Sequence, residues 1–441
     1  MERPSDPALR AALSAGQMID WNLPPDDVAW PVARGMLAYY ESGGYYPVGG
    51  SAGIAETMAE VIESNGGFVL GGARVGEVAI DAETRTVTGV KMKRRRGGDD
   101  DDGDFIPCGV VVSAVGYRGT FERLIPEKAA AALGVDEIKT AVARAGLKNS
   151  HGHVCAYVSL DGTPTELGLR PANVHSFPDD LGDAYGYDVG RACRDFYANP
   201  LGGDAASSEA GGKKVKKPVE PLVTITSPSA KDPTWERDHP GRANALLLME
   251  GIEDWFEPFK DTSWGRRGPE YEAFKARFES TFLSRLYAFY PKCEGRVTHV
   301  ELSTPLTAAH FINAPGGGSY GLEWTKTHFD PWLQENAFNP SVKGVRGLYM
   351  TGEAIAFGGF YGALANGFIT VSHVIGLPRF FWLLATDSRK TPPEVYEDGR
   401  EPPGATTEEV EEENEKAKAK EEETEEEEEA DAKASAVQKV L

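Results

Sequence analysis

A helical period of apolar residues is clearest in two segments, Ser51–Asn65 and Pro269–Tyr290. In the first segment, Ser51 can cap the start and Gly66-Gly67 ends the run. In the second, a proline opens the helix, and one face is an aromatic stripe that favours a core position over the wall of a ligand tunnel. The two predicted apolar faces comprise Ile54, Ala55, Met58, Val61 and Ile62, and Tyr271, Phe274, Phe278, Phe282, Leu286 and Phe289.

Short apolar runs after the first helix predict strands. Three of them follow it directly: Phe68–Leu70, Val75–Ile80 and Val87–Met92. Lys93–Asp104 places a basic block beside an acidic one, which predicts an exposed hairpin loop. Cys108–Gly116 is a continuous apolar run that ends in small residues, the pattern of a strand buried on both faces of a parallel sheet. The fold class predicted is α/β.

The last part of the folded sequence combines a strand, a glycine-rich turn and a helix. Leu348–Met350 predicts a short strand that leads into Thr351-Gly352-Glu353, and a buried helix is expected to open at about Gly362. The N-terminus of a helix offers free N–H groups and partial positive charge, which suit a pyrophosphate or the side of a flavin that becomes negative on reduction. A packed βα unit without a ligand explains the same pattern about equally well.

No uninterrupted apolar stretch is long enough to span a bilayer. The longest candidate, Gly362–Ala385, is interrupted by polar residues and a proline. Its last part, Phe380–Leu384, predicts a buried helix, with contact to a membrane surface as the alternative. The first thirty residues contain no long apolar run and no basic leader, so no signal or transit peptide is visible.

Composition narrows the function classes. At 441 residues, with 41% hydrophobic residues, the chain is long enough for about two to three domains. A net charge of −22 argues against nucleic acid, which requires a basic surface. Glu408–Asp431 holds 15 acidic residues and 3 lysines, so this tail carries −12 and the remainder −10. It predicts a solvated tail, with binding of a protein partner as the alternative.

The cysteines point to no metal or disulfide framework. Their spacing fits neither a zinc knuckle nor a redox pair, and their number is too small for a disulfide scaffold. A reducing compartment is therefore the simpler expectation. The four residues are Cys108, Cys155, Cys193 and Cys293.

One glycine motif has the spacing of a dinucleotide-binding site but is weak evidence for one. Gly316, Gly318 and Gly321 spell G-x-G-x-x-G, the fingerprint of dinucleotide-binding folds. That fingerprint must follow a strand and open a helix, and neither is predicted here. We expect instead a loop in which the backbone approaches a neighbour closely.

Two other motifs have ordinary alternatives. Gly49–Gly53 matches the G-x-S-x-G elbow of serine hydrolases, but no late histidine lies in a convincing loop. A helix N-cap is the commoner role for Ser51. His151, His153 and Cys155 share one face of a predicted strand and are zinc-type ligands. No fourth ligand is evident, so ordinary strand residues in a mixed sheet are the favoured interpretation.

Several separate motifs occur in one order that resembles a known family. Together they resemble the retinol saturase, carotenoid isomerase and phytoene desaturase family of FAD flavoproteins, most of all its retinol-reductase-like branch. The resemblance covers roughly residues 10 to 376. The segments that carry it are SAGQMIDWNLPPDDVAW, YYPVGGSAGIAETMAEVIESNGG, VVVSAVG, SPSAKDPTWERDHPG, RRGPEYEAFKARFESTFLSRL, STPLTAAHFINAPGGGSYGL and GLYMTGEAIAFGGFYGAL.

The resemblance implies positions for a flavin near the end of the fold. Gly352 and Glu353 fall where the family's second FAD motif contacts the cofactor. Many members have aspartate at the position of Glu353, so a carboxylate is kept. Gly362 and Ala363 fall at the start of the helix that faces the flavin.

The resemblance also implies roles for earlier residues. Val75 falls on the strand that borders the adenine, and Ser113 to Gly116 resembles the strand end near the ADP portion. The glycine-rich loop around Gly318 falls in the substrate region. Tyr320 in that loop is a speculative candidate for a general acid.

The chain differs from the family in one respect. Members begin with a βαβ unit that carries the true dinucleotide fingerprint, and no segment before Gly49 matches it. We therefore expect an uncovered sheet edge and an exposed apolar face, whether the gene model is incomplete or the unit is lost, and FAD binding by this chain alone is in doubt.

The expected fold is an incomplete FAD/NAD(P)-binding flavoprotein fold with a mixed-sheet substrate domain. Residues 1–44 form a family-like N-terminal segment of the substrate region, and 45–119 a portion of the FAD domain. Residues 120–340 form the substrate domain, with a polar insertion at 195–218. The remaining expected parts are a C-terminal FAD-binding portion, 341–385, and an acidic disordered tail, 386–441.

The function implied by the resemblance is FAD-dependent redox chemistry at a C=C bond of a retinoid, carotenoid or other isoprenoid lipid. Saturation, desaturation and isomerisation share this framework, in which the protein supplies position, dryness and electrostatics. NAD(P)H is a candidate electron donor, and relatives imply an endoplasmic reticulum or plastid membrane. The alternatives are a serine hydrolase using Ser51 and a truncated, non-catalytic lipid-binding protein.

Overall fold

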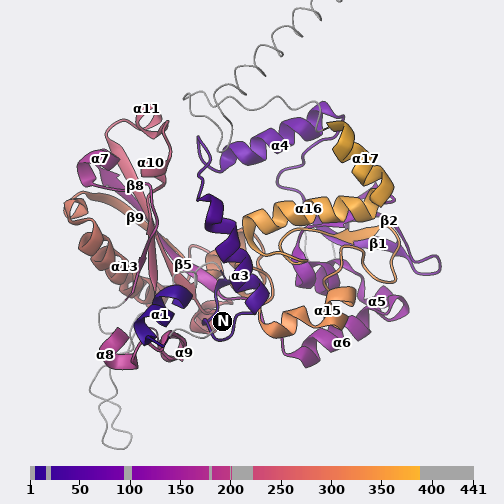
Figure 1. Ribbon diagram of the computed structural model, residues 1–441. Coiled ribbons are helices and arrows are strands. Elements are labelled where there is room, and N and C mark those ends of the chain that lie inside the picture. Colours follow the sequence, from indigo (N-terminus) through magenta and orange to yellow (C-terminus); the bar gives the residue numbers. More distant parts are fainter. Residues whose placement is uncertain are drawn as a thin grey trace, which may run out of the picture. The chain divides into compact units, whose positions relative to one another are not determined.

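The computed structural model describes residues 5–15, 21–93, 102–177, 181–198, 200 and 222–387. These residues form a mixed α/β fold with three sheets, which confirms the predicted fold class (Figure 1). The chain divides into two compact units, Met1–Gly376 and Leu377–Leu441, and the sheets belong to the first. No helix in the described ranges has the length and apolar character needed to cross a membrane.

The largest sheet has five antiparallel strands in the order β6-β7-β8-β5-β9. Inward and outward residues alternate along β5 and β8, so one face is apolar. Helix α13 (Pro269–Phe289) lies along this sheet (Figure 1). The strands are β5 (Gly152–Asp161), β6 (Val174–Ser176), β7 (Val223–Thr226), β8 (Arg242–Gly251) and β9 (Val297–Ser303).

The aromatic stripe of α13 fills the core of this region, as predicted. Tyr271, Phe278, Phe282 and Leu286 are buried, and Phe274 is half-buried. Their neighbours are the inward residues of β5 and β8, including Val154 and Leu247. Phe289, at the end of the helix, is exposed, so the predicted apolar face stops one turn earlier.

A second sheet consists of three antiparallel strands, β1 (Arg74–Asp81), β2 (Thr86–Lys93) and β3 (Asp102–Pro107). The strands predicted at Val75–Ile80 and Val87–Met92 are confirmed. The predicted hairpin loop lies largely outside the described residues, but β2 and β3 on either side of it do pair. Phe68–Leu70 forms no strand, so that prediction was wrong.

The third sheet is a parallel pair, β4 (Val111–Ser113) and β10 (Leu348–Met350). Both strands were predicted, but the prediction that the Cys108–Gly116 run is buried on both faces was wrong. Val110 and Val115 are exposed, and Val112 is 47% exposed. The reason is that β4 has only β10 as a neighbour among the described strands, so one edge and one face are open.

A second apolar core lies beside the parallel pair. Its helices α5, α6 and α15 pack with Tyr117, Phe121 and Phe338 and with the inward residues of β4 and β10. The bounds are α5 (Glu127–Leu133), α6 (Val135–Ala145) and α15 (Pro331–Asn336), and a π-helical segment, η2, spans Arg118–Leu124.

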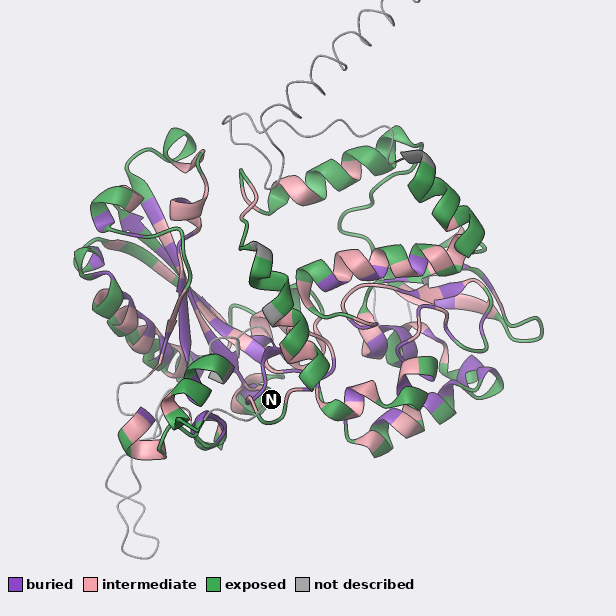
Figure 2. Ribbon diagram, viewed as in Figure 1, coloured by how far each residue is buried: buried purple, intermediate pink, exposed green. Residues whose placement is uncertain are grey.

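Helix α4 (Ala52–Ser64) confirms the first predicted helix, but its apolar face is not covered. It buries no residue, as Figure 2 shows, and Met58, Val61 and Ile62 are exposed. Ser51 occupies the N-cap position with helical φ and ψ, and its side chain makes no capping hydrogen bond. Ser51 thus lies at the predicted N-cap position, but the predicted capping hydrogen bond is wrong. Its side chain could form that bond only with an extended backbone at Ser51.

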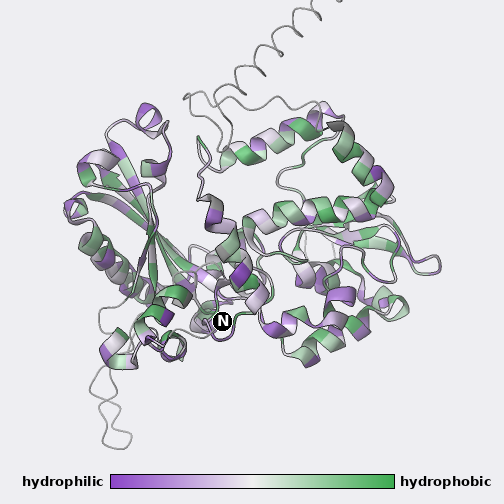
Figure 3. Ribbon diagram, viewed as in Figure 1, coloured by the Kyte–Doolittle hydropathy of each residue, from purple (hydrophilic) through white to green (hydrophobic). Residues whose placement is uncertain are grey.

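Helix α16 (Gly359–Ile375) begins three residues before the predicted start at Gly362. Its buried residues are Gly362, Asn366 and Thr370, while Phe368 is exposed. Figure 3 shows that the helix is apolar along most of its length. The prediction of a buried helix was wrong for the opposite side of α16, which carries exposed residues such as Phe368.

Helix α17 (Leu377–Asp387) belongs to the second unit. The favoured prediction of a buried helix at Phe380–Leu384 was wrong, since four of these five residues are exposed and Phe380 is half-buried. Of the predicted insertion 195–218, the first four residues end helix α9, and nearly all the rest lies outside the described residues. The acidic tail also lies outside them.

The remaining helices are short. They are α1 (Pro7–Ala15), α3 (Trp30–Tyr39), α7 (Pro164–Leu167), α8 (Leu181–Tyr185), α9 (Val189–Ala198), α10 (Pro228–Lys231), α11 (Trp235–Asp238), α12 (Glu253–Phe256) and α14 (Pro305–Phe311).

Candidate functional site

The carboxyl ends of β4 and β10 meet, and they bring four predicted cofactor residues together. The Thr351 N–H donates to the Ser113 carbonyl at 2.9 Å, so the chain leaves both strands at one point. Gly116 and Gly352 follow the strands with φ of 70° and 82°, conformations that favour glycine. A Cβ on Gly352 would lie 3.5 Å from the Ala114 carbonyl oxygen. The hydrogen bond makes the site a backbone junction, where a side chain on Gly352 would be in ordinary van der Waals contact with Ala114.

Glu353 is half-buried at this junction. Its carboxylate accepts a hydrogen bond from the Gly359 N–H, in the first turn of α16. Desolvation by burial raises the pKa of Glu353 to about 7, and this hydrogen bond opposes the shift. A carboxylate already lies at the helix N-terminus, where an anionic ligand was expected.

Gly362 and Ala363 lie one turn further along α16. A Cβ on Gly362 would come within 2.4 Å of the Phe357 carbonyl oxygen, so a larger residue would push the helix from its preceding turn. Ala363 is half-buried. Asn366 donates to the Gly352 and Phe357 carbonyls at 2.7 and 2.9 Å and holds the turn against the helix.

Two residues that hold the junction were not predicted. Asn366 is fully buried, and the hydroxyl of Thr370, also buried, donates to the Met350 carbonyl at 2.9 Å. The available signal was a pair of polar residues at a spacing of four inside an apolar helix. Such residues pair with backbone groups when they are buried.

Val75 lies apart from the other predicted cofactor residues. It is near the start of β1 and pairs with Met92 across the antiparallel sheet. Ser113 and Gly352, by contrast, belong to the parallel pair β4–β10 or the turn that follows it. The Ser113 hydroxyl is itself occupied, since it shares a hydrogen bond of 2.8 Å with the buried Thr120 hydroxyl.

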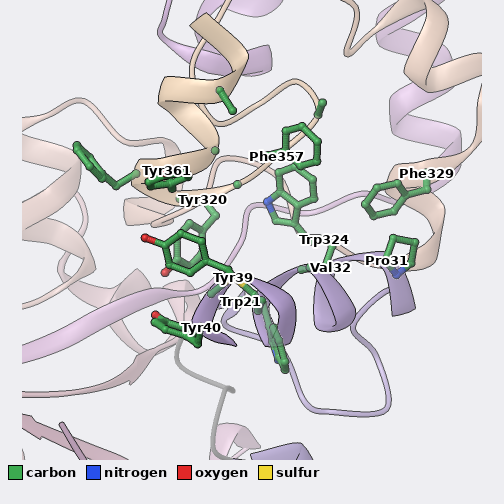
Figure 4. A pocket seen from close by; sticks show the side chains of 18 residues that line it. Trp21, Pro31, Val32, Tyr39, Tyr40, Tyr320, Trp324, Phe329, Phe357 and Tyr361 are labelled. Atoms are coloured by element: carbon green, nitrogen blue, oxygen red, sulfur yellow. The ribbon is translucent and has the colours of Figure 1, made fainter. Parts of the chain in front are cut away.

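A cavity of about 520 Å³ lies against the start of α16, within the size range of small-molecule pockets. Figure 4 shows aromatic side chains from α3, from the Tyr320–Trp324 loop and from the turn before α16 facing one another. The lining comprises Trp21, Pro31, Val32, Gly35, Met36, Tyr39, Tyr40, Tyr320, Trp324, Phe329, Ala356, Phe357, Gly358, Gly359, Phe360, Tyr361, Gly362 and Ala365.

None of these 18 lining residues is charged. The polar groups in the wall are the hydroxyls of Tyr39, Tyr40, Tyr320 and Tyr361 and the indole N–H groups of two tryptophans. Burying a charged ligand without a partner is costly, so the cavity suits an apolar, uncharged molecule with at most a hydrogen-bonding end. Sequence reasoning found Tyr320 and Gly362 but missed the contribution of α3.

Tyr320 contacts residues at the start of β5. Its N–H donates to the Ser150 hydroxyl at 2.8 Å, and its ring lies edge-on to His153 with 6.4 Å between centroids. A Cβ on Gly317 would lie 2.2 Å from the Pro305 carbonyl oxygen. The glycine-rich loop is therefore a place of close backbone approach, as predicted.

The two other sequence motifs lead to no catalytic or metal centre. Among the described residues, Ser51 makes no side-chain hydrogen bond with a histidine, so the structure gives no support to a hydrolase. His153 shares a hydrogen bond of 2.7 Å with the Ser319 hydroxyl. Burial raises the pKa of the Cys155 thiol to about 11, and no cluster of three metal-ligating side chains occurs in the part described.

Comparison with known proteins gives one consistent set of relatives. No protein-family model matches the chain. It is 30% identical to human (Homo sapiens) all-trans-retinol 13,14-reductase over 369 residues, which are 84% of this chain and 55% of that protein. The Danio rerio all-trans-retinol 13,14-reductase is 27% identical over 351 residues, 80% of this chain and 52% of that protein.

Another Danio rerio relative carries the name inactive all-trans-retinol 13,14-reductase, at 27% identity over 355 residues, 80% of this chain and 53% of that protein. Similarity at this level therefore includes a relative without the activity. The chain spans about half the length of the curated relatives it matches. The resemblance drawn from the motifs is nonetheless confirmed: the chain is homologous to the all-trans-retinol 13,14-reductases and is retinol saturase-like.

Proposed function

We propose that this chain carries the substrate cavity and the C-terminal flavin contact of an FAD-dependent oxidoreductase that acts on a C=C bond of an uncharged retinoid or related isoprenoid. The observation that supports the proposal is that the start of α16 borders the cavity. Gly359 and Gly362, at the helix start predicted to face a flavin, also line the uncharged aromatic cavity. A cofactor at the junction and a ligand in the cavity would therefore be neighbours.

The residues at the junction fit the backbone contacts of such a cofactor. Gly116 and Gly352 present no side chain at the carboxyl ends of two parallel strands, where nucleotides bind in open α/β sheets. Glu353, next to Gly352, is placed to accept hydrogen bonds from hydroxyl groups. We propose an incomplete FAD/NAD(P)-binding fold on this basis, with a reduced nicotinamide cofactor as the electron source.

Bound FAD would supply the hydride-transfer chemistry at the C=C bond. The chain's own residues position the ligand and keep water out, because the cavity wall is aromatic and uncharged. Tyr320 is the proposed proton donor, since its side chain lines the cavity. Reduction is the direction that the names of the relatives favour over desaturation or isomerisation.

The cofactor proposal is tested by titrating FAD with the purified chain and following flavin fluorescence. We expect saturable quenching that Gly352→Ala weakens by at least about tenfold, because a side chain would enter the backbone junction. Gly265→Ala is the matched control. Gly265 also has a positive φ, of 74°, but it faces open space and lies outside the site.

Equal loss of quenching in both variants would mean that backbone strain, and not the junction, controls binding. Absence of quenching by the wild-type chain, while retinol still binds, would contradict the cofactor part of the proposal. In that case the chain would keep the cavity without the flavin contact.

A further inference from the structure

Two tryptophans in the cavity wall have indole N–H groups without a hydrogen-bond partner among the described residues. They are Trp21 and Trp324, which are 4% and 3% exposed. Both belong to one small apolar cluster beside the cavity. Buried N–H groups are nearly always paired in proteins, because leaving one unpaired is costly. Two such groups in the wall of one cavity indicate that a molecule bound there supplies the acceptor.

The surroundings of Trp324 leave its indole N–H facing the cavity. One face of its ring stacks on His328, with 4.3 Å between the centroids, and its carbonyl accepts from the Ala29 N–H at 3.1 Å. A Cβ on Gly358 would lie 3.1 Å from the indole nitrogen, so the turn before α16 borders this edge of the ring. Figure 4 shows the nitrogen on the side of the ring toward Tyr320, another residue of the cavity wall.

The exposure of the lining residues gives the cavity a buried end and an exposed end. The two tryptophans mark the buried end, whereas Phe357, Phe360 and Tyr361 are 55% to 61% exposed. A long, narrow isoprenoid would therefore insert one end and leave the other near solvent. Because the indole N–H groups lie at the buried end, a hydrogen-bond acceptor on the inserted end would meet them.

The chemistry of the indole group limits the ligand. An indole N–H only donates, so its partner must be an acceptor. Hydroxyl, aldehyde and ketone oxygens accept and carry no charge, which matches a lining without charged residues. A hydrocarbon of the same shape would displace water from the two N–H groups without replacing its hydrogen bonds. The two groups should therefore favour an oxygen-bearing ligand over the corresponding hydrocarbon.

We propose that Trp21 and Trp324 determine ligand specificity by donating hydrogen bonds to the terminal oxygen of an isoprenoid alcohol or carbonyl compound. The ligand binds with that oxygen at the buried end of the cavity. This inference rests on the proposed function, because it takes the cavity as the substrate site. It adds the residues that select the ligand, the orientation of the ligand, and the class that is disfavoured, the isoprenoid hydrocarbons.

The test compares all-trans-retinol with the hydrocarbon in which a hydrogen atom replaces its hydroxyl group. Retinol binding to the full chain is followed by the fluorescence of the bound retinoid, and the hydrocarbon is added as a competitor. The quantity compared is the ratio of the two affinities. Trp324→Phe should shift this ratio toward the hydrocarbon, since phenylalanine keeps a ring but has no N–H. Adding Trp21→Phe should shift it by at least about tenfold in total.

Phe357→Leu is the matched control, since Phe357 lines the same cavity but has no side-chain hydrogen-bonding group. It should weaken both ligands alike and leave the ratio unchanged. Hydrocarbon binding shows in the same samples that each variant is folded. An unchanged ratio in the double variant would overturn the inference, while the cavity itself would still bind an isoprenoid. Failure of the wild type to bind either ligand would overturn the inference together with the substrate cavity of the proposed function.

Discussion

Two regions of the chain differ in how far their apolar residues are buried. In the five-stranded region, α13 covers the sheet and its aromatic stripe is buried. In the rest of the first unit, the apolar strand β4 has one neighbour among the described strands, α4 buries no residue and α16 exposes Phe368. Both regions have the sequence pattern of a core. The difference is that, among the described residues, only the five-stranded region has its apolar residues covered.

The contrast explains why one predicted strand did not form. Phe68–Leu70 is as apolar as the inward side of β5, yet Phe68 is 70% exposed. A strand is stable only where a neighbour pairs with its backbone and covers its side chains. The second region therefore has strand-forming sequence without a strand partner among the described residues.

The largest expected difference in stability is between the alanine variants of two phenylalanines, one in each region. Phe282→Ala should lower the free energy of unfolding by about 3–5 kcal/mol, because Phe282 is fully buried against the five-stranded sheet. Phe368→Ala, on the exposed side of α16, should change it by less than about 0.5 kcal/mol. Urea unfolding measures both. Similar losses would show that the exposed face of α16 is covered in solution.

The pH dependence of stability tests whether the His328 ring is buried in the core beside β4 and β10, although one edge of that sheet is open. Its ring is stacked between Trp324 and Phe338, and burial lowers its pKa from 6.5 to about 4. The unfolded chain binds this proton more readily, so stability should fall by up to about 3 kcal/mol as the pH drops from 6.5 through 4. His328→Phe keeps the stacking and should remove that loss. An unchanged pH profile would mean that the ring is not buried.

Titration of Glu353 should change the free energy of unfolding by less than titration of His328 does, and with the opposite dependence on pH. Burial raises its pKa from 4.5 to about 7, so the folded chain holds the proton longer than the unfolded chain. Protonated Glu353 therefore contributes to stability below pH 4.5, and this contribution is lost as the pH rises through 7. The expected loss in the free energy of unfolding is about 2 kcal/mol, because the group is incompletely buried. Glu353→Gln should flatten stability between pH 5 and 8. A steeper slope in the variant would contradict this assignment.

The smallest effect on stability should come from the open strand. Val112→Lys should change the free energy of unfolding by less than about 0.5 kcal/mol, because this side chain is already exposed. It should nevertheless reduce aggregation several-fold, since a lysine blocks pairing along a free strand edge. Light scattering on heating measures the difference. Aggregation equal to that of the wild type would show that β4 is protected.

The fold was predictable where local pattern and long-range contacts agree. The period of α13, the strands β1 and β2, and the strand–turn–helix around Gly352 all follow from residue order. The exposure of α4, Val112 and α17 did not, because the pattern of apolar residues specifies a face and not whether anything covers it.

The candidate site was predictable in part. The resemblance assigned Ser113, Gly116, Gly352 and Glu353 to one cofactor, and the junction of β4 and β10 brings these residues together. It could not reveal Trp21 or Tyr39, because these cavity residues lie about 300 positions from Tyr320 in the sequence and meet it only through folding.

The most direct test of the proposed function is product analysis after the chain is incubated with chemically reduced FAD and all-trans-retinol without oxygen. We expect a retinoid that has gained two hydrogen atoms at one C=C bond, detected by mass and by loss of polyene conjugation. We also expect that Tyr320→Phe slows product formation without abolishing retinol binding. Saturable retinol binding with no reduced product, when FAD is shown to be bound, would contradict the proposed function.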